Sequence, residues 1–328
     1  MKFINSFSEL AAVQQYDTIA CDIYGVLHDG YEPYPYTLQT LAHLESSNQV
    51  VLLSNSSRMY PALSHQLSST FNILPTAYND ILSSGKLTRL FLEDCQRYLD
   101  GQATTTRLGV QDFCAQQGWT AQKAVRFFIA GGVDYLGPLY DGLDCFEPTE
   151  DWDAMAFVLL GSIKPLYGTD KVDPFDEASV IAHYRPFLEK CLARKVPVIC
   201  TNPDVWAPSG VNTDGSQRLL ICPGYVGEMY KAMGGQVLYF GKPYKTIYDY
   251  LGEGSGGGKI LCVGDNVATD VLGANDVGLD VVLILGGVHA KQFPDLHDHH
   301  SVFAQVRQLC QEAGTQEPTY VMPYLRWN

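Results

Sequence analysis

Short apolar runs recur along the chain and alternate with segments whose apolar residues return at helical spacing. The runs are rich in β-branched and aliphatic residues, and such near-continuous runs are typical of parallel strands buried on both faces. We therefore predict strands at 18–22, 50–54, 125–130, 156–160, 196–200, 237–240, 260–263 and 281–284.

Helical spacing predicts a helix over 36–45 and another over 175–184, which Asp173 and Pro174 would begin as cap and first-turn residues. Pro186 is expected to kink or split the second helix. Strands that alternate with helices predict an α/β fold with a parallel sheet and right-handed crossovers. The glycine-rich stretch 252–258 is expected to be a flexible connector, because its spacing does not fit a phosphate-binding P-loop.

Length and charge narrow the classes of protein. The 328 residues allow two domains, or one domain with a large insertion, and 46% hydrophobic residues suffice for a buried core. The formal charge of −14 disfavours nucleic acid and anionic membranes as partners. It does not exclude anionic small molecules, since a lysine or a metal ion reverses the local field.

The nine cysteines include no CxxC pair, so neither a disulfide framework nor a zinc cluster has support from their spacing. The N-terminal residues show no apolar signal-peptide core, and the apolar runs are too short to span a bilayer. A cytoplasmic location is the expectation.

Four predicted strand ends carry residues that could take part in catalysis or ligand binding. Asp22 ends the first strand, Ser54 and Asn55 end the second, Lys242 follows the strand at 237–240, and Asp265 and Asp270 follow the strand at 260–263. Open α/β sheets place their active sites at the carboxyl ends of strands. Each residue taken singly also fits an ordinary cap, turn or solvated surface position, but the ordered set favours a common site.

The set matches the needs of phosphoryl transfer. Carboxylates at Asp22 and Asp265 are the hard oxygen ligands that Mg²⁺ prefers. Asp22 can attack phosphorus to give an aspartyl-phosphate, while Ser54 and Asn55 can bind the phosphate oxygens. Lys242 can neutralise charge on the transferring group. We therefore assign Asp22, Ser54 and Lys242 as catalytic, and Ser54, Asn55 and Lys242 as phosphate-binding.

The motifs resemble those of the haloacid dehalogenase (HAD) superfamily, and more closely its subfamily IIA of NagD-like and p-nitrophenyl phosphatase-like proteins. The resemblance covers about 17–289. The matching segments are Asp22-x-x-Gly-Val-Leu, Leu-Ser54-Asn55-Ser-Ser-Arg58, Ile81-Leu-Ser-Ser-Gly85, Thr201-Asn-Pro-Asp204, Gly241-Lys242-Pro243 and Gly264-Asp265 with Asp270.

The resemblance implies a Rossmann-like three-layer core with a parallel sheet, interrupted by an inserted α/β cap domain. The core would comprise 1–85 and 223–328, and the cap 86–222. It further implies that Mg²⁺ is held by Asp22, Asp265 and the backbone carbonyl of Tyr24. Asp270 would support these ligands, and Asn202 and Asp204 would lie at the junction of substrate and cap.

Tyr24 departs from the family pattern, which has a second aspartate there as the general acid and base. Loss of such a group costs about a hundred- to ten-thousand-fold in rate. Three interpretations remain open: a slow or specialised phosphatase that recruits His28 or Asp29, an enzyme for substrates with a good leaving group, or a binding protein. A partly exposed turn is the more ordinary role for His28 and Asp29.

The resemblance implies a Mg²⁺-dependent hydrolase acting on a small phosphorylated metabolite of the sugar or polyol phosphate class. The alternative is a catalytically impaired protein that binds or senses a phosphorylated ligand. A homodimer is a possible assembly. The cluster 297–300 is interpreted as a solvated loop and not as a metal site, and Trp206 is expected either to face substrate or to pack. The aromatic residues after 289 are expected to pack on the core.

Overall fold

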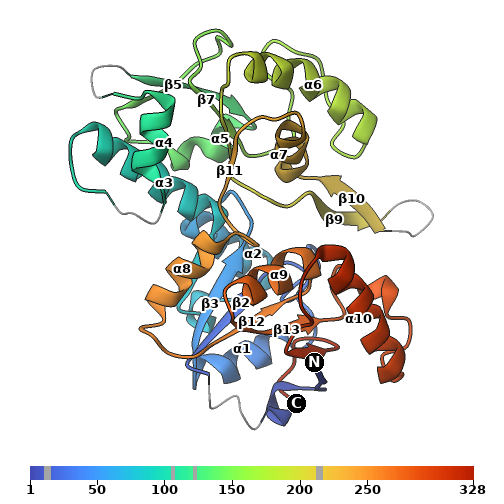
Figure 1. Cartoon of the computed structure of the whole chain (residues 1–328). Coiled ribbons are helices and arrows are strands. Elements are labelled where there is room, and N and C mark those ends of the chain that lie inside the picture. The colour runs from blue at the N-terminus through green and yellow to red at the C-terminus, as the bar shows by residue number, and fades with distance from the viewer. Residues whose placement is uncertain (11–15, 105–107, 121–123, 212–216) are drawn as a thin grey trace. The chain divides into compact units, whose positions relative to one another are not determined.

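The computed structural model describes residues 1–10, 16–104, 108–120, 124–211 and 217–328 (Figure 1). The chain forms two units. The first comprises Met1–Ser54, Tyr60–Leu82 and Lys242–Asn328, and the second comprises Asn55–Met59 and Ser83–Gly241. The first unit is thus assembled from both ends of the chain, with the second unit inserted, and each unit contains its own sheet.

The first unit contains a sheet of seven strands in the order β1-β14-β13-β12-β2-β3-β4. The central strands β2 (Thr18–Asp22) and β12 (Ile260–Gly264) pair in parallel, with Ile19 opposite Leu261. The remaining strands are β3 (Gln49–Ser54), β4 (Asp80–Ser83), β13 (Asp280–Ile284), β14 (Tyr320–Met322) and β1 (Lys2–Phe3). Every residue of β2 and β12 is buried, as their apolar sequences predict.

The order of the strands reverses between β2 and β12, because the chain runs outward from β2 to β3 and β4 on one side and from β12 to β13 and β14 on the other. Right-handed crossovers then place the connecting helices on opposite faces. Figure 1 shows α1 (Thr37–Glu45) on one face and α8 (Lys245–Gly254), α9 (Leu272–Asp276) and α10 (His299–Ala313) on the other. The remaining helix of this unit is α2 (Tyr60–Phe71). Such a reversal is where open α/β sheets bind ligands.

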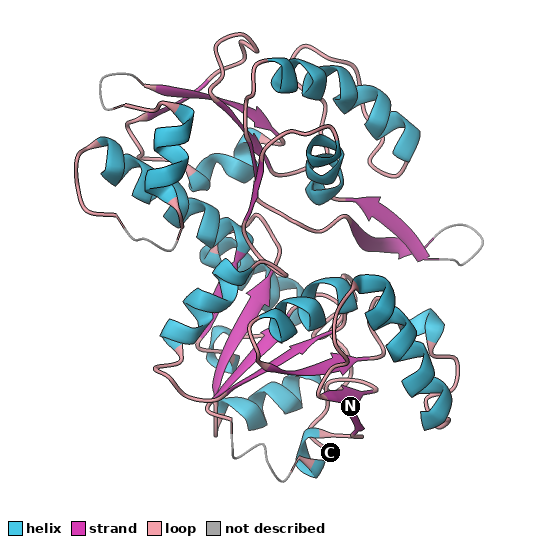
Figure 2. Cartoon of the chain, in the orientation of Figure 1, coloured by secondary structure: helices cyan, strands magenta, loops and turns pink. Residues whose placement is uncertain are grey.

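The second unit contains a parallel sheet in the order β11-β8-β7-β5-β6 and an antiparallel pair, β9 with β10 (Figure 2). Its core is aromatic: Phe127 and Phe157 stack with ring centroids 5.0 Å apart. The strands are β5 (Val125–Ala130), β6 (Phe146–Pro148), β7 (Phe157–Leu160), β8 (Val198–Cys200), β9 (Trp206–Val211), β10 (Gln217–Ile221) and β11 (Val237–Tyr239). The helices are α3 (Ser84–Leu99), α4 (Val110–Gln117), α5 (Val133–Leu136), α6 (Glu177–Ala193) and α7 (Pro223–Ala232).

The division of the chain differs from the boundaries expected at 86 and 222. β11 pairs with β8 in the second sheet, so the inserted unit continues to Gly241. At its start, the Ser57 hydroxyl donates to the carbonyl of Gly161 (3.2 Å) and accepts from the Thr201 hydroxyl (2.6 Å). These bonds group the residues after Ser54 with the inserted unit.

The predicted strands are all present, and so are both predicted helices, but the second helix differs in detail. It begins at Glu177, where the Asp176 carboxylate accepts from the N–H of Ala178, and it continues through Pro186 to Ala193. Buried Phe187 and Leu188 follow the proline, and their packing compensates for the one backbone bond that proline removes. The expected connector at 252–258 is partly helical, since α8 extends to Gly254.

The segment after His289 completes the first sheet. β14 lies between β13 and β1, with Val321 opposite both Leu283 and Phe3. Met322 and Leu325 are buried in the core, and Trp327 packs against it, which confirms the expected packing of the aromatic end. The prediction of a loop over 297–300 was wrong for its second half: α10 begins at His299, and Asp298 caps it by accepting from the N–H of Ser301. Across the described ranges, no helix is both long and apolar enough to cross a bilayer.

Candidate active site

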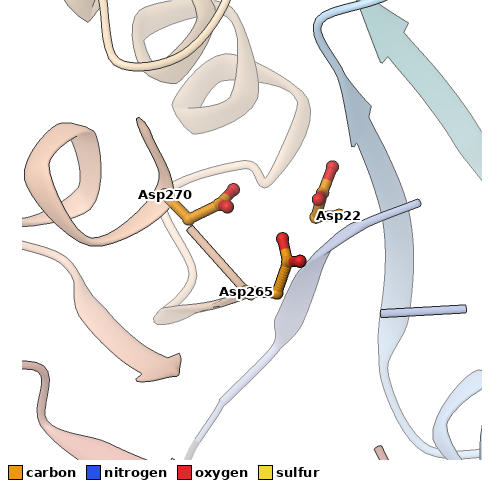
Figure 3. Close-up of side chains that lie close together, drawn as sticks. All are labelled: Asp22, Asp265 and Asp270. Atoms are coloured by element: carbon orange, nitrogen blue, oxygen red, sulfur yellow. The ribbon is translucent and has the colours of Figure 1, made fainter. Parts of the chain in front are cut away.

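Asp22 is the last residue of β2, and Asp265 directly follows β12, so the pairing of these strands brings their carboxylates to one edge of the sheet. Asp270 reaches the same place from the π-helical turn Val267–Val271. One carboxylate oxygen from each of the three lies within 4.8 Å of the others (Figure 3). Within the described part of the chain, this is the only such cluster of metal-ligating side chains.

Lys242 joins two of these carboxylates. Its Nζ lies 2.5 Å from Oδ1 of Asp22 and 2.7 Å from Oδ1 of Asp270, and the lysine is buried, with only 3% of its surface exposed. Oδ2 of Asp270 accepts from the N–H of Asn266 (3.1 Å). Both oxygens of Asp270 are therefore bonded to protein groups, an arrangement suited to supporting the site.

Glycines make room for the carboxylates. A Cβ at Gly25, where φ is +82°, would lie 2.0 Å from Oδ2 of Asp265, and one at Gly287 would lie 2.2 Å from the same oxygen. A Cβ at Gly264 would lie 2.1 Å from Cγ of Asp270. Side chains at these three positions would displace the acidic groups, so the backbone is shaped around them.

The electrostatics of the cluster are those of excess negative charge in a buried place. Burial raises the pKa of Asp22 to about 7, although Lys242 acts in the opposite direction. Burial, and then the charges of Asp22 and Asp270, raise the pKa of Asp265 well above its ordinary value. Burial alone would lower the pKa of Lys242, but the two aspartates outweigh it and hold the ammonium charged.

The Tyr24 side chain is held in the following turn. Its hydroxyl donates to the backbone carbonyl of Asp29 (2.8 Å), and a Cβ at Gly30 would lie 2.8 Å from that hydroxyl. The Asp29 carboxylate accepts from the N–H groups of Tyr31 and Glu32, each at 2.8 Å. The ring of Tyr24 thus belongs to the framework of the turn, and Asp29 has the ordinary turn role.

His28 is also structural in this conformation. Its ring stacks on Phe71 with centroids 3.8 Å apart, and Nδ1 accepts from the N–H of Gly30 (3.0 Å). Burial lowers its pKa to about 4, so the ring is neutral. The expected exposure of His28 was wrong, because this side chain is only 5% exposed.

The remaining predicted residues lie at the ends of other segments. Ser54 is buried at the end of β3, one strand from Asp22. Asn55 belongs to the second unit, where its Nδ2 donates to Oδ1 of Asp204 (2.8 Å) and the Asp204 N–H donates to Oδ1 of Asn202 (2.9 Å). The phosphate contact of Asn55, the substrate contact of Asn202 and Asp204, and the metal bond of the Tyr24 carbonyl stay predictions. Trp206 contacts Tyr225 edge to face, with centroids 5.5 Å apart.

Sequence reasoning missed the turn after β13. The N–H of Val288 donates to Oδ2 of Asp265 (2.6 Å), and Nε2 of neutral His289 accepts from the N–H of Val267 (3.3 Å). A signal was present, because Gly286 and Gly287 follow the strand predicted at 281–284 and so lie at the same sheet edge. It went unused because this strand end carries no side chain with obvious chemistry.

Two family models match the chain. The model described as haloacid dehalogenase-like hydrolase matches residues 19–115, and the model described as HAD-hydrolase-like matches residues 239–326. Together they include Asp22, Lys242, Asp265 and Asp270. No curated protein sequence matches the chain.

Solved structures share the architecture. A haloacid dehalogenase-like family hydrolase from Brucella suis is 28% identical, with 98% of this chain and 100% of that chain covered, at a TM-score of 0.66. A possible sugar phosphatase from Cytophaga hutchinsonii is 20% identical, with 99% and 98% covered, at 0.64. A p-nitrophenyl phosphatase from Archaeoglobus fulgidus is 19% identical, with 94% and 97% covered, at 0.56. The last two likenesses are of fold.

Proposed function

Because the chain belongs to the haloacid dehalogenase-like hydrolases, we propose that it is a Mg²⁺-dependent phosphatase that hydrolyses a small phosphomonoester through an aspartyl-phosphate on Asp22. The observation that carries this proposal is the buried cluster itself. Three aspartates face a single lysine, which leaves a formal charge of −2 at full ionisation. Buried charge of this sign is costly unless a cation accompanies it.

The donor set fits magnesium. Mg²⁺ prefers a few carboxylate oxygens and fills its remaining positions with water or phosphate oxygens. Asp22 and Asp265 would hold the ion, while Asp270 stays bonded to Lys242 and Asn266. When bound, the ion would offset the negative charge of the phosphate and of the carboxylates around it.

The chain's own residues then supply the chemistry. An Asp22 oxygen attacks phosphorus, a new O–P bond forms, and the ester O–P bond breaks. The alkoxide leaves with the electron pair and takes up a proton from solvent. Water next attacks phosphorus and loses a proton to solvent, and the O–P bond to Asp22 breaks, which frees inorganic phosphate and restores the Asp22 carboxylate. The Lys242 ammonium lies beside Asp22 and stabilises negative charge there, and Ser54 is proposed to donate to a phosphate oxygen.

The substrate class proposed from the motifs is a sugar or polyol phosphate. One observation favours a second candidate, a protein that binds such a ligand with slow turnover. Position 24 carries a tyrosine in place of a carboxyl group that could protonate an alkoxide leaving group, and the Tyr24 hydroxyl donates to the backbone carbonyl of Asp29. The two candidates share the site and differ in rate.

A panel of phosphomonoesters separates them. The panel contains sugar phosphates, polyol phosphates and p-nitrophenyl phosphate, assayed with Mg²⁺ and with EDTA, with Asp22→Asn as the matched control. The phosphatase proposal expects Mg²⁺-dependent phosphate release that the control lacks. Ligand-dependent thermal stabilisation with negligible release would favour the binding protein. Absence of both would refute the proposed site.

A further inference from the structure

The end of the C-terminal strand reaches the active-site edge of the sheet. Backbone hydrogen bonds continue past Ile284, the last residue of β13. The N–H of Leu285 donates to the carbonyl of Met322, and the N–H of Gly286 donates to the carbonyl of Pro323, each at 2.9 Å. The turn at 286–288 is therefore held along one side by the segment that follows β14. This segment lies outside the motifs that define the site.

The side chain of Tyr324 packs against this turn. A Cβ built at Gly286 would lie 2.2 Å from Cε1 and 2.5 Å from Cδ1 of Tyr324, so the ring lies directly against the glycine. The Tyr324 ring also neighbours the ring of Tyr34, with centroids 6.1 Å apart and the ring planes tilted by 47°. The contact at Gly286 uses the edge of the ring and not the hydroxyl.

The residues after Gly286 hold the metal-ligand candidate Asp265. Gly287 allows the carboxylate to approach, and the Val288 N–H donates to its Oδ2 at 2.6 Å. Tyr324, the turn and Asp265 thus form a continuous chain of contacts within the first unit. The hydrogen bond from the Val288 N–H orients Oδ2 of Asp265, while Oδ1 is the oxygen proposed to bind the ion.

We infer that Tyr324 is a positioning residue for the magnesium site, acting through the Gly286–Val288 turn on Asp265. The inference rests on the proposed function, since it takes Asp265 to be a Mg²⁺ ligand. Removal of a group that orients a metal ligand without binding the metal itself typically lowers metal affinity by about 10- to 100-fold. This role differs from general packing, because loss of the Tyr324 ring should change the orientation of one carboxylate, that of Asp265, and so the affinity for Mg²⁺.

The test is Mg²⁺ binding by isothermal titration calorimetry on the full chain. Tyr324→Ala is expected to raise the Kd for Mg²⁺ by about 10-fold or more, whereas Tyr324→Phe keeps the ring edge and the wild-type Kd. Trp327→Ala is the matched control. It removes an aromatic side chain from the same C-terminal segment, but Trp327 stacks on His43, with centroids 4.9 Å apart. It is expected to lower stability without changing the Kd.

A second variant approaches the same contact from the glycine. Gly286→Ala places a methyl group against the Tyr324 ring and is expected to weaken Mg²⁺ binding. The double variant Gly286→Ala/Tyr324→Ala removes the overlap, so the added alanine should cost less there than in the wild-type background. Urea unfolding, followed in parallel, separates loss of folding from loss of affinity. Tyr324 is 39% exposed, and its truncation leaves the core filled.

Each outcome decides the inference. A wild-type Kd in Tyr324→Ala, or equal weakening by Trp327→Ala, would overturn it while leaving the magnesium site intact. Additive effects of Gly286→Ala and Tyr324→Ala would also overturn it. If the wild-type chain binds no Mg²⁺, the proposed function itself fails, and the inference fails with it.

Discussion

Replacement of Lys242 by methionine removes one buried ammonium and keeps most of the side-chain volume. The wild-type lysine contacts Asp22 at 2.5 Å and Asp270 at 2.7 Å, and the side chains are 4%, 12% and 5% exposed, respectively. Removal of one partner from a buried ion pair costs about 3–5 kcal/mol, because the remaining charges lose their compensation. We expect a loss of that size in the free energy of unfolding of the metal-free protein at about pH 8.

The expected loss depends on pH. Near pH 8 the wild-type Asp22 carboxyl is ionised beside the ammonium. Without the lysine, which lowers the pKa of Asp22, this carboxyl must either stay ionised without its partner or take up a proton, and both are unfavourable. Burial raises the pKa of Asp22 to about 7, so near pH 5 this carboxyl is already protonated and needs the lysine less. The loss in Lys242→Met should therefore be smaller near pH 5 than near pH 8.

Urea unfolding in EDTA at the two pH values, followed by tryptophan fluorescence, measures both losses. Lys245→Met is the matched control, since Lys245 pairs with Asp249 on the surface with 72% of its side chain exposed. Exposed pairs of this kind contribute about 0.3–0.5 kcal/mol. A Lys242→Met loss as small as that of the control, or an equal loss at both pH values, would refute the electrostatic account of the cluster.

Three further expectations concern the same site. The pKa of Asp22 is about 7 in the folded protein against an ordinary value of 3.8, so the stability of the metal-free protein falls as the pH rises between these values. Because Mg²⁺ replaces the proton at this carboxyl, the ion should raise Tm in thermal unfolding more near pH 8 than near pH 5. The reverse order would contradict this expectation. Tyr24→Asp should raise kcat for an alkyl phosphate by about 100-fold while Tyr24→Phe does not, and equal rates in steady-state assays would count against the missing acid. Gly25→Ala should abolish Mg²⁺ binding in calorimetry because its Cβ meets Asp265 at 2.0 Å, whereas Gly101→Ala, with a similar φ of +71° and open space, should bind normally.

Much of the first unit was predictable because its signals are local. Buried strands such as β2 and β12 read as apolar runs, and the rule that ligands bind at the carboxyl ends of strands places Asp22 and Asp265 together. The same rule singled out Lys242 and Asp270, which also follow predicted strands, and the structure shows Lys242 bonded to both Asp22 and Asp270. These predictions depend on the periodicity of the sequence and on short spacings.

The remaining features depend on contacts between distant residues. The end of the inserted unit at Gly241 follows from the pairing of β11 with β8, which no local pattern indicates. Burial of His28 depends on Phe71, and the hold on Asp265 depends on a backbone N–H of Val288. Backbone donors leave no trace in residue identity, so sequence reasoning finds them only where a glycine signals a close approach.

The most direct test of the central claim is whether Asp22 becomes phosphorylated. Wild-type protein and Asp22→Asn are mixed with p-nitrophenyl phosphate and Mg²⁺, quenched in acid within the first turnover, and analysed by peptide mass spectrometry alongside the rate of phosphate release. We expect a hydroxylamine-sensitive phosphoryl group on the Asp22 peptide of the wild type, and neither this group nor phosphate release in Asp22→Asn. Phosphate release by Asp22→Asn at the wild-type rate would contradict the account.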